Sequence, residues 1–359
     1  MKRKLMIAGG GTGGHVLAGV AIAQAWNKRF GLDGTIVYVG ARGRIEERIV
    51  PQHQIKLYLL SLGSLNRVSF LRKILTVLQL PWALIKSLFL IVKEKPDAVI
   101  GVGGYASGPV LLMASFLSKF FSIQTAVLEQ NSVPGLTNRI LGRFVEKIFC
   151  AFTDHQRLLP AKKIEVTGNP IRMELTSLGP APIDPFQLFI FGGSQGARGL
   201  NTLVIETMPL VQKKFPNVKI IHQTGVLDYL RVKRAYEDTN VKAKVVEFID
   251  NMKEVYQDST LLICRAGSST LAEIAAIQRA AILVPLPTAS DGHQLKNAEA
   301  LVSQGAAVLA EQTKTSPEQL AKKIFDLIEH PQKLHEIEKK AHTLHRPHAA
   351  SDIVKQFEF

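Results

Sequence analysis

Cysteine is nearly absent from this 359-residue sequence. The two that occur, Cys150 and Cys264, lie far apart in apolar surroundings. Such cysteines argue against a disulfide framework and a cysteine metal site, and they suit a reducing compartment. The N-terminus also lacks the apolar core of a secretory signal peptide, because a glycine run follows the first apolar residues. We therefore expect a cytoplasmic protein.

Metal-binding motifs are missing as well. The sequence contains neither an Asp-x-Asp pair, which would hold a metal-nucleotide complex, nor a His-Glu-x-x-His motif. His342, His345 and His348 cluster near the C-terminus, but Pro347 interrupts them and no acidic or cysteine partners are evident. We expect neither a metal nor a cofactor.

Acidic residues are outnumbered, with 30 Asp and Glu against 44 Lys and Arg and a formal net charge of +14. This excess predicts an anionic partner: nucleic acid, an acidic membrane surface or phosphorylated substrates. The basic residues do not interleave with aromatic ones, and no nucleic-acid reader motif occurs. We therefore expect no nucleic-acid partner.

Short apolar runs alternate with helical patterns along the chain. They occur at 5–8, 35–39 and 98–102, and the pattern restarts at 187–191 after a loop at 179–185. This alternation is typical of parallel sheets with crossover helices. It predicts an α/β protein with two Rossmann-like, doubly wound domains whose strand ends face a shared cleft.

The linker between the two domains is predicted from a proline-restricted segment. Gly168-Asn-Pro170 marks the linker, because a residue before proline disfavours helix and ends an element. The expected domains are 1–167 and 168–340, and a C-terminal helix within 341–359 returns to the first domain.

Four glycine-rich loops each follow an apolar strand and lead into a helix, at 9–15, 101–108, 192–197 and 265–270. Backbone N–H groups and the helix dipole at such loops hold phosphates. A single loop of this kind can simply tighten a turn, but four together predict more than one phosphorylated ligand.

A dinucleotide-dependent oxidoreductase is the competing interpretation of the first loop. It requires an acidic residue at the end of the second strand, where this chain has Val39-Gly-Ala-Arg42. Binding of NADP through Arg42 and Arg44 would leave the other glycine loops unexplained.

Two polar segments of the second half suit a nucleotide sugar. Ser268, Ser269 and Thr270 can cap a helix and bind phosphate, and Glu273 can accept hydrogen bonds from ribose hydroxyls. The alternative for Glu273 is a surface acid that complements the helix dipole. The loop at 285–297 offers amide and imidazole donors for sugar hydroxyls.

An apolar stretch at 74–92 is long enough to suggest a membrane span. A span would place the two halves of one βαβ domain on opposite sides of the membrane, so we predict a helix that lies on the surface instead. An ordinary crossover helix with one buried face is the alternative. The predicted membrane patch comprises Lys73, Leu75, Leu78, Trp82, Lys86, Leu88 and Phe89.

Taken together, these motifs resemble the MurG family along nearly the whole chain. The matching segments are Gly9 to His15, Gly103 to Pro109, Glu129-Gln-Asn131, Gly168 to Arg172, Gly192 to Arg198, Arg265 to Glu273 and His293 to Ala298. The resemblance implies a GT-B fold, and inverting transfer of N-acetylglucosamine (GlcNAc) from UDP-GlcNAc to the N-acetylmuramyl (MurNAc) 4-hydroxyl of lipid I, which gives lipid II. It also implies a peripheral enzyme on the cytoplasmic face of the bacterial inner membrane, with other cell-wall synthesis proteins as candidate partners.

The resemblance also assigns substrate-binding residues, with the donor mainly on the C-terminal domain. The UDP-GlcNAc set is Thr12, Gly13, Gly14, His15, Asn131, Arg172, Ser194, Ile249, Ser268, Ser269, Thr270, Glu273, His293 and Gln294. The acceptor set is Gly103, Gly104, Tyr105 and Ser107, because the N-terminal glycine loops would face the acceptor's diphosphate.

His15 is the predicted catalytic base, because it ends a phosphate-type loop facing the expected cleft; binding a phosphate or sugar is its alternative role. A UDP-GlcNAc 2-epimerase of the same fold is the rival function. The apolar and basic segment argues against it, since a soluble epimerase has no use for a lipid surface.

Overall fold

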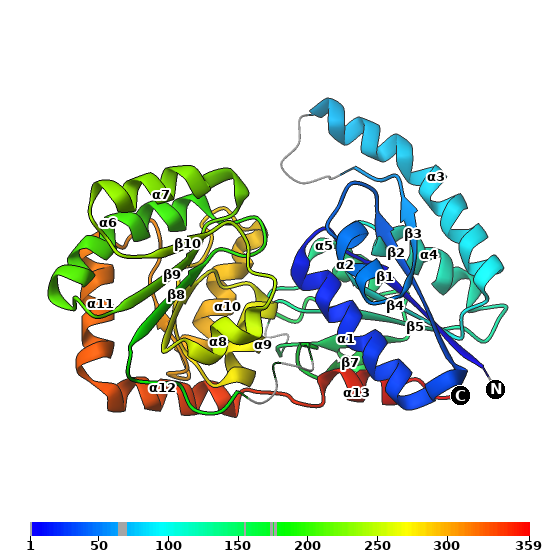
Figure 1. Cartoon of the computed structure of the whole chain (residues 1–359). Helices are drawn as coiled ribbons and strands as arrows, with labels where there is room; N and C mark the ends of the chain where they lie inside the picture. Colours follow the sequence, from blue (N-terminus) through cyan, green and yellow to red (C-terminus); the bar gives the residue numbers. More distant parts are fainter. Residues whose placement is uncertain (1, 64–69, 154–155, 173–174, 176–177) are drawn as a thin grey trace. The chain divides into compact units, whose positions relative to one another are not determined.

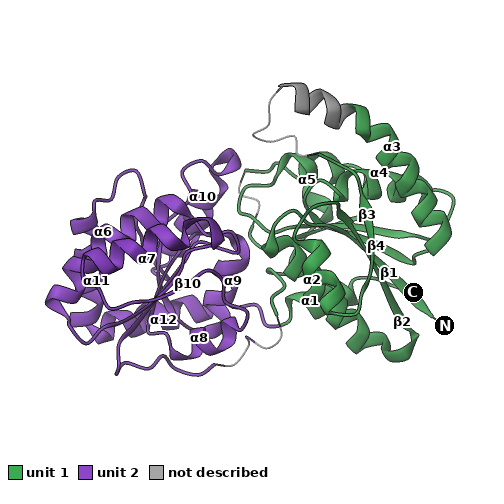
Figure 2. Cartoon of the chain, turned by 45° about the horizontal axis from the view of Figure 1, so that its top comes forward, with its two compact units in different colours: residues 1–172, 348–359 green, residues 173–347 purple. Residues whose placement is uncertain are grey.

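The computed structural model describes residues 2–63, 70–153, 156–172, 175 and 178–359, without the side chains of residues 70–77. The chain forms two compact units, Met1–Arg172 with His348–Phe359 and Met173–Pro347 (Figure 2). Each unit is built around its own parallel sheet (Figure 1), which confirms the predicted α/β class with two doubly wound domains.

Unit 1 contains a sheet of seven described strands in the order β3-β2-β1-β4-β5-β6-β7. The strands are β1 (Arg3–Gly9), β2 (Gly34–Ala41), β3 (Lys56–Leu60), β4 (Ala98–Gly103), β5 (Gln124–Glu129), β6 (Lys147–Cys150) and β7 (Ile164–Val166). The helices are α1 (Gly13–Phe30), α2 (Glu46–Gln52), α3 (Phe70–Glu94), α4 (Ser107–Leu117), α5 (Leu136–Leu141) and α13 (Ala349–Lys355).

Alternation along the buried strands sorts these helices between the two faces of the sheet. Met6 and Ala8 of β1 pack in one core with α3, α4 and α5, whereas Leu5 and Ile7 pack in another with α1 and α13. Successive side chains of a strand point to opposite faces, so a strand covered on both sides is apolar throughout.

Unit 2 repeats this architecture with six described strands in the order β10-β9-β8-β11-β12-β13. The strands are β8 (Gln187–Phe191), β9 (Lys219–Gln223), β10 (Lys244–Val246), β11 (Leu261–Cys264), β12 (Ala280–Leu283) and β13 (Val308–Leu309). The helices are α6 (Arg198–Lys214), α7 (Tyr229–Asp238), α8 (Met252–Asp258), α9 (Ser268–Ile277), α10 (His293–Val302), α11 (Pro317–Glu329) and α12 (Pro331–Thr343).

A buried arginine joins several segments of unit 2. Arg279 has no exposed surface, and its guanidinium donates to the backbone carbonyls of Gly179, Tyr256, Gln257, Ile277 and Gln278. Four of these carbonyls lie at the ends of α8 and α9, so Arg279 ties the two helix ends together.

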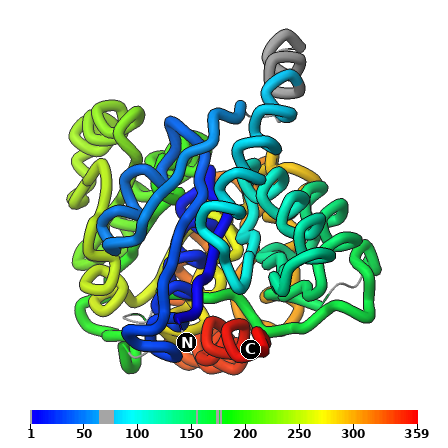
Figure 3. The backbone as a smooth tube through the Cα atoms, turned by 90° about the vertical axis from the view of Figure 1, so that its right-hand side faces the viewer, coloured from blue at the N-terminus to red at the C-terminus, as the bar shows by residue number. Residues whose placement is uncertain are grey.

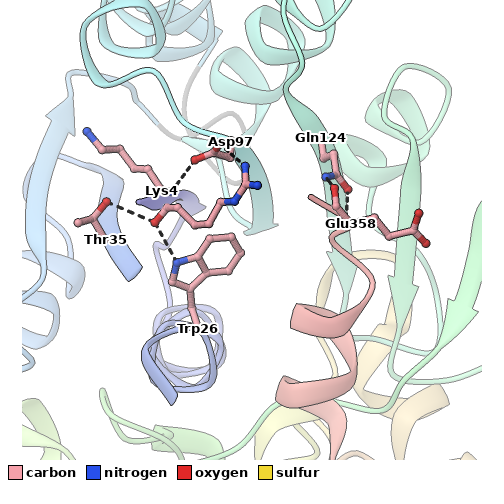
Figure 4. Close-up of polar contacts among 7 residues, drawn as sticks. Lys4, Trp26, Thr35, Asp97, Gln124 and Glu358 are labelled. Carbon is pink, nitrogen blue, oxygen red and sulfur yellow. Dashed lines mark hydrogen bonds and ion pairs between the residues drawn. The ribbon is translucent and has the colours of Figure 1, made fainter. Parts of the chain in front are cut away.

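The last residues of the chain complete unit 1, where the C-terminus lies beside the first strand (Figure 3). Phe357 is buried against Trp26, and Phe359 packs on the edge of the same indole. The side-chain amide of Gln124 donates to Glu358 O and accepts from Glu358 N (Figure 4). The Trp26 indole donates to Arg3 O on β1. The C-terminal segment is therefore part of the core of unit 1.

The C-terminal segment forms two separate helices, α12 and α13. They are separated by the residues between Thr343 and Ala349, where Pro347 lies. Proline lacks an N–H and disfavours helix in the residue before it. The chain passes between the units at Arg172–Met173 and at Pro347–His348, a few residues beyond the predicted boundaries at 167 and 340.

We expect Phe357→Ala to destabilise unit 1 by about 3–5 kcal/mol, because it empties a fully packed site. Phe359→Ala is the matched control and should cost about 1 kcal/mol, since that ring is 45% exposed and adds mainly an aromatic edge contact. Urea unfolding followed by tryptophan fluorescence tests this, because both tryptophans, Trp26 and Trp82, lie in unit 1. Equal losses of unfolding free energy in the two variants would contradict the placement of Phe357 in the core of unit 1.

Candidate active site

Two glycine loops of unit 1 meet at the carboxyl edge of its sheet. They follow β1 and β4, neighbouring strands from which the chain continues in opposite directions, so they flank the switch point of the sheet. Gly10 N donates to Gly103 O at 3.0 Å. A Cβ on Gly104 would lie 2.2 Å from Gly10 O, so only glycine permits this approach.

His15 lies in the first turn of α1, at this junction. Its Nδ1 is 3.1 Å from Thr12 Oγ1 and 3.3 Å from Gly10 O. Its ring also covers the second loop, because a Cβ on Gly103 would lie 2.8 Å from His15 Nε2. The structure therefore brings together Thr12, Gly13, Gly14 and His15 with the predicted acceptor residues Gly103 and Gly104.

A buried glutamate that the sequence analysis did not identify supports the first loop from behind. Glu46 has no exposed surface; its Oε2 accepts from Gly11 N at 3.0 Å and its Oε1 from Ala41 N at 2.9 Å. Its signal in the sequence is weak, because it occurs in a run of acidic and basic residues typical of an exposed helix.

The remaining predicted residues of unit 1 surround these loops in different ways. Tyr105 is half-buried, whereas Ser107 is fully buried and its Oγ donates to Gly104 O at 2.7 Å, so this hydroxyl supports the turn from inside. Asn131 follows β5, and its backbone N donates to Glu129 Oε1 at 2.8 Å. Glu129 also accepts from Gly135 N at 2.9 Å, which shapes the loop that carries Asn131.

In unit 2, three candidate loops follow adjacent strands. β8, β11 and β12 are neighbours, so the loops at 192–197, 265–268 and 285–292 lie along one stretch of the sheet's carboxyl edge. β8 and β11 also flank the switch point of this sheet, the usual ligand position in such folds. Within the first of these loops, Gly196 N donates to Gly193 O at 2.9 Å.

The N-terminus of α9 collects the predicted phosphate and ribose residues. Ser268, Ser269 and Thr270 occupy its first three positions, where backbone N–H groups lack helical acceptors. Glu273 is only 7% exposed, and its Oε2 accepts from the Tyr256 hydroxyl at 3.0 Å. The alternative of a surface acid is therefore wrong: Glu273 is directed inward and held by Tyr256.

Arg265 braces the loops after β11 and β12. Its guanidinium donates to Val284 O at 3.0 Å, to Pro285 O at 3.1 Å and to Gln312 Oε1 at 2.6 Å. Burial lowers the pKa of Arg265 to about 10, which leaves the group charged at neutral pH. These three acceptors belong to protein groups, so Arg265 positions the loops.

The polar residues that follow β12 shape the start of α10. His293 is its first residue, and the ring Nδ1 lies 2.7 Å from Ser290 O. Gln294 Oε1 accepts from Leu286 N at 2.9 Å. Both side chains are half-buried.

The other predicted donor residues lie in three further segments of the chain. Ser194 is exposed in the loop after β8, and Ile249 is half-buried beyond β10. Arg172 is half-buried and is the last residue of unit 1 before the chain enters unit 2.

An apolar surface covers α3 and the adjacent ends of α4 and α5. It comprises Leu78, Trp82, Ile85, Phe89, Val92, Phe116, Phe120, Phe121, Leu136, Ile140 and Phe144, which are 46–70% exposed. Exposed basic residues accompany it at Lys93, Lys119 and Arg143. We call these residues the α3–α5 surface.

Of the predicted membrane patch, the structure exposes Leu78, Trp82 and Phe89. Two further members turn inward: Lys86 donates to Leu59 O at 2.7 Å, and Leu88 packs against the core of unit 1. Lys73 and Leu75 lie outside the described side chains. Among the helices that the structure describes, none is long and apolar enough to cross a membrane.

The C-terminal end of α3 is held to the sheet by Glu94. Lys4 and Lys56 form ion pairs with its carboxylate at 3.0 and 2.8 Å, and Tyr58 donates to it. Burial raises the pKa of Glu94, but the hydrogen bonds from Lys56, Tyr58 and Lys4 outweigh this effect and lower the pKa to about 2.

The glycosyltransferase family 28 N-terminal domain matches residues 5–150, and the C-terminal domain of the same family matches residues 187–357. The chain is 42% identical to UDP-N-acetylglucosamine--N-acetylmuramyl-(pentapeptide) pyrophosphoryl-undecaprenol N-acetylglucosamine transferase from Syntrophus aciditrophicus, over 99% of this chain and 98% of that protein. The protein of the same name from Myxococcus xanthus is 40% identical, over 98% of this chain and 91% of that protein.

Solved structures agree with this relationship. The crystal structure of Acinetobacter baumannii MurG covers 99% of both chains at 30% identity and a TM-score of 0.76. The match to a UDP-GlcNAc 2-epimerase from Neisseria meningitidis also covers 99% of both chains, at a TM-score of 0.67. Its sequence identity is 13%, so this match shows a shared fold alone. The chain therefore belongs to the MurG family of UDP-sugar glycosyltransferases, within glycosyltransferase family 28.

Proposed function

We propose that this enzyme transfers GlcNAc from UDP-GlcNAc to the MurNAc 4-hydroxyl of lipid I, giving lipid II and UDP. The proposal rests on the near full-length similarity to relatives named for this transfer, at 37–42% identity. The reaction belongs to peptidoglycan synthesis, on which bacterial cell shape and division depend.

Unit 2 binds the donor in this proposal. The N-terminus of α9 presents backbone N–H groups and the hydroxyls of Ser268, Ser269 and Thr270 to the diphosphate, and the helix dipole favours its charge. Glu273 accepts from the ribose, while Ile249 lies against uracil. Ser194 adds a donor at the phosphates, as does Arg172, the last residue of unit 1, and His293 and Gln294 bind the sugar. The predicted extent of this domain is residues 168–340.

Unit 1 supplies the acceptor side and the base. Gly10 O can only accept a hydrogen bond, so its contact with His15 favours a proton on Nδ1 and leaves the ring's lone pair on Nε2. In the proposed step, Nε2 takes the 4-hydroxyl proton as the oxygen attacks C1 of GlcNAc from the face opposite UDP. The C1–O bond to UDP breaks, the anomeric configuration inverts, and the helix N-terminus stabilises the diphosphate.

The α3–α5 surface would dock on the membrane that carries the lipid acceptor. Its aromatic side chains suit the interface, and the neighbouring lysines and arginines suit anionic headgroups. We infer a peripheral enzyme on the cytoplasmic face of the inner membrane, with residues 1–167 forming the acceptor and membrane domain. Other cell-wall synthesis proteins are candidate partners.

We expect His15→Ala to lower kcat by about 100-fold or more, because the residue would act as general base. Donor KM should change little, since the main donor contacts lie on unit 2. Transfer of radiolabelled GlcNAc to a lipid I analogue measures both values, and His53→Ala, an exposed histidine of unit 1, is the matched control. A kcat for His15→Ala close to that of wild type would rule out the role as base.

We expect Glu273→Ala to raise donor KM by about tenfold or more, the cost of losing hydrogen bonds to a charged group. Tyr256→Phe removes the hydroxyl that donates to this carboxylate while keeping the ring. It should leave donor KM within about twofold if Glu273 acts on the ribose directly. Equal effects of the two variants would assign Glu273 a structural role only.

We expect wild type to sediment with phosphatidylglycerol vesicles and the double variant Trp82→Ser, Phe89→Ser to bind them about tenfold or more weakly, because burial of two exposed aromatic rings is lost. Leu32→Ser, at a fully exposed residue of the short 3-10 helix Gly31–Asp33 in unit 1, is the control. Trp26 is already buried, so a blue shift of emission on vesicles would come from Trp82. Undiminished sedimentation of the double variant would exclude this surface.

A further inference from the structure

A carboxyl group is buried directly behind the glycine loop that carries His15. Glu46 is completely inaccessible, and both of its oxygens are engaged by backbone N–H groups, one from Gly11 and one from Ala41. The first belongs to the loop and the second to the end of β2. Glu46 therefore ties the loop to the sheet.

The loop is shaped around this carboxyl group. A Cβ added to Gly10 would lie 2.3 Å from Glu46 Oε1, and one added to Gly40 would lie 2.5 Å from Glu46 Cγ. Glycine at both positions lets the side chain reach between the two strands. Gly10 and Gly11 have φ values of 143° and 84°, a region that glycine reaches readily but does not prefer strongly. The hydrogen bond from Gly11 N to Glu46 Oε2 favours this conformation of the loop.

The same backbone contacts His15. Gly10 uses its N–H to bond Gly103 O and its carbonyl to meet His15 Nδ1, while Gly11 N is held by Glu46. A chain of direct contacts thus runs from Glu46 through Gly11 and Gly10 to the imidazole. A shift of Gly10 would change both the position of the His15 ring and the hydrogen bond that favours its Nδ1 proton.

We propose that Glu46 is a positioning residue for the transfer reaction. Acting through Gly10 and Gly11, it keeps His15 and the glycine loop at 101–108 in their positions relative to each other. The inference rests on the proposed function, because His15 matters only if it acts in transfer. Glu46 is sealed from solvent and makes its bonds within the protein, so it acts on the substrate indirectly.

The test compares Glu46→Gln with Glu47→Gln. Gln keeps the shape but turns an NH2 group toward one of the two N–H donors, so one bond is lost. Glu47 is the next residue of the same helix, is exposed, and accepts from Gly43 N at 2.5 Å, so its replacement controls for charge and for a backbone contact outside the glycine loop. Glu46→Asp is a second variant, with the charge retained and the reach shortened.

We expect Glu46→Gln and Glu46→Asp each to lower kcat by about tenfold or more, the effect of losing a hydrogen bond to a charged group. The affinity for UDP, measured by calorimetry, should stay within about twofold, because UDP would bind unit 2. Hydrogen exchange of the amides of residues 10–16 should accelerate by about tenfold or more relative to Glu47→Gln.

Unchanged kcat and unchanged exchange at residues 10–16 would overturn the inference. So would a parallel loss of UDP affinity and of protection across unit 2, because the defect would then be general misfolding. If wild type transfers no GlcNAc, the proposed function fails; the exchange comparison would still decide whether Glu46 holds the loop.

Discussion

In unit 1 the Gly10 N–H donates to Gly103 O, and in unit 2 Gly196 approaches Thr224 O so closely that a Cβ would lie 1.9 Å away. These backbone contacts between neighbouring loops organise the carboxyl edges of both sheets. Side chains would hold the loops apart, and the N–H groups and helix N-termini would no longer be presented together. The positions of His15 and of the start of α9 follow from this constraint.

Buried carboxylates connect segments near these loops. Glu46 accepts from Gly11 and Ala41, Glu129 from the loop that carries Asn131, and Glu273 from the Tyr256 hydroxyl. A buried carboxylate is tolerated when donors satisfy its oxygens, and each of these recruits donors from a different segment. Burial of Glu46 and Glu129 is thereby coupled to the order of a loop, and burial of Glu273 to the packing of α8 on α9.

The two faces of the unit 1 sheet are covered in different ways. One face of its sheet is closed by α1, α2 and α13, with Phe357 packed against Trp26, so the C-terminus completes that core. The other face is covered by α3, α4 and α5, whose outer sides retain large apolar residues. Glu94 holds the end of α3 to the sheet, so its exposed aromatic residues are carried on a fixed element.

The sequence by itself determined the α/β class, the repeated architecture and the glycine loops, because apolar strands, helical periodicity and glycine runs are local patterns. Tertiary structure alone decided which side chains face inward. Lys86 and Leu88 belong to the apolar segment but turn to the core, and Glu46 lies in a charged run yet is wholly buried. Burial of a single side chain depends on which distant strands and loops pack around it, and a local pattern does not contain that information.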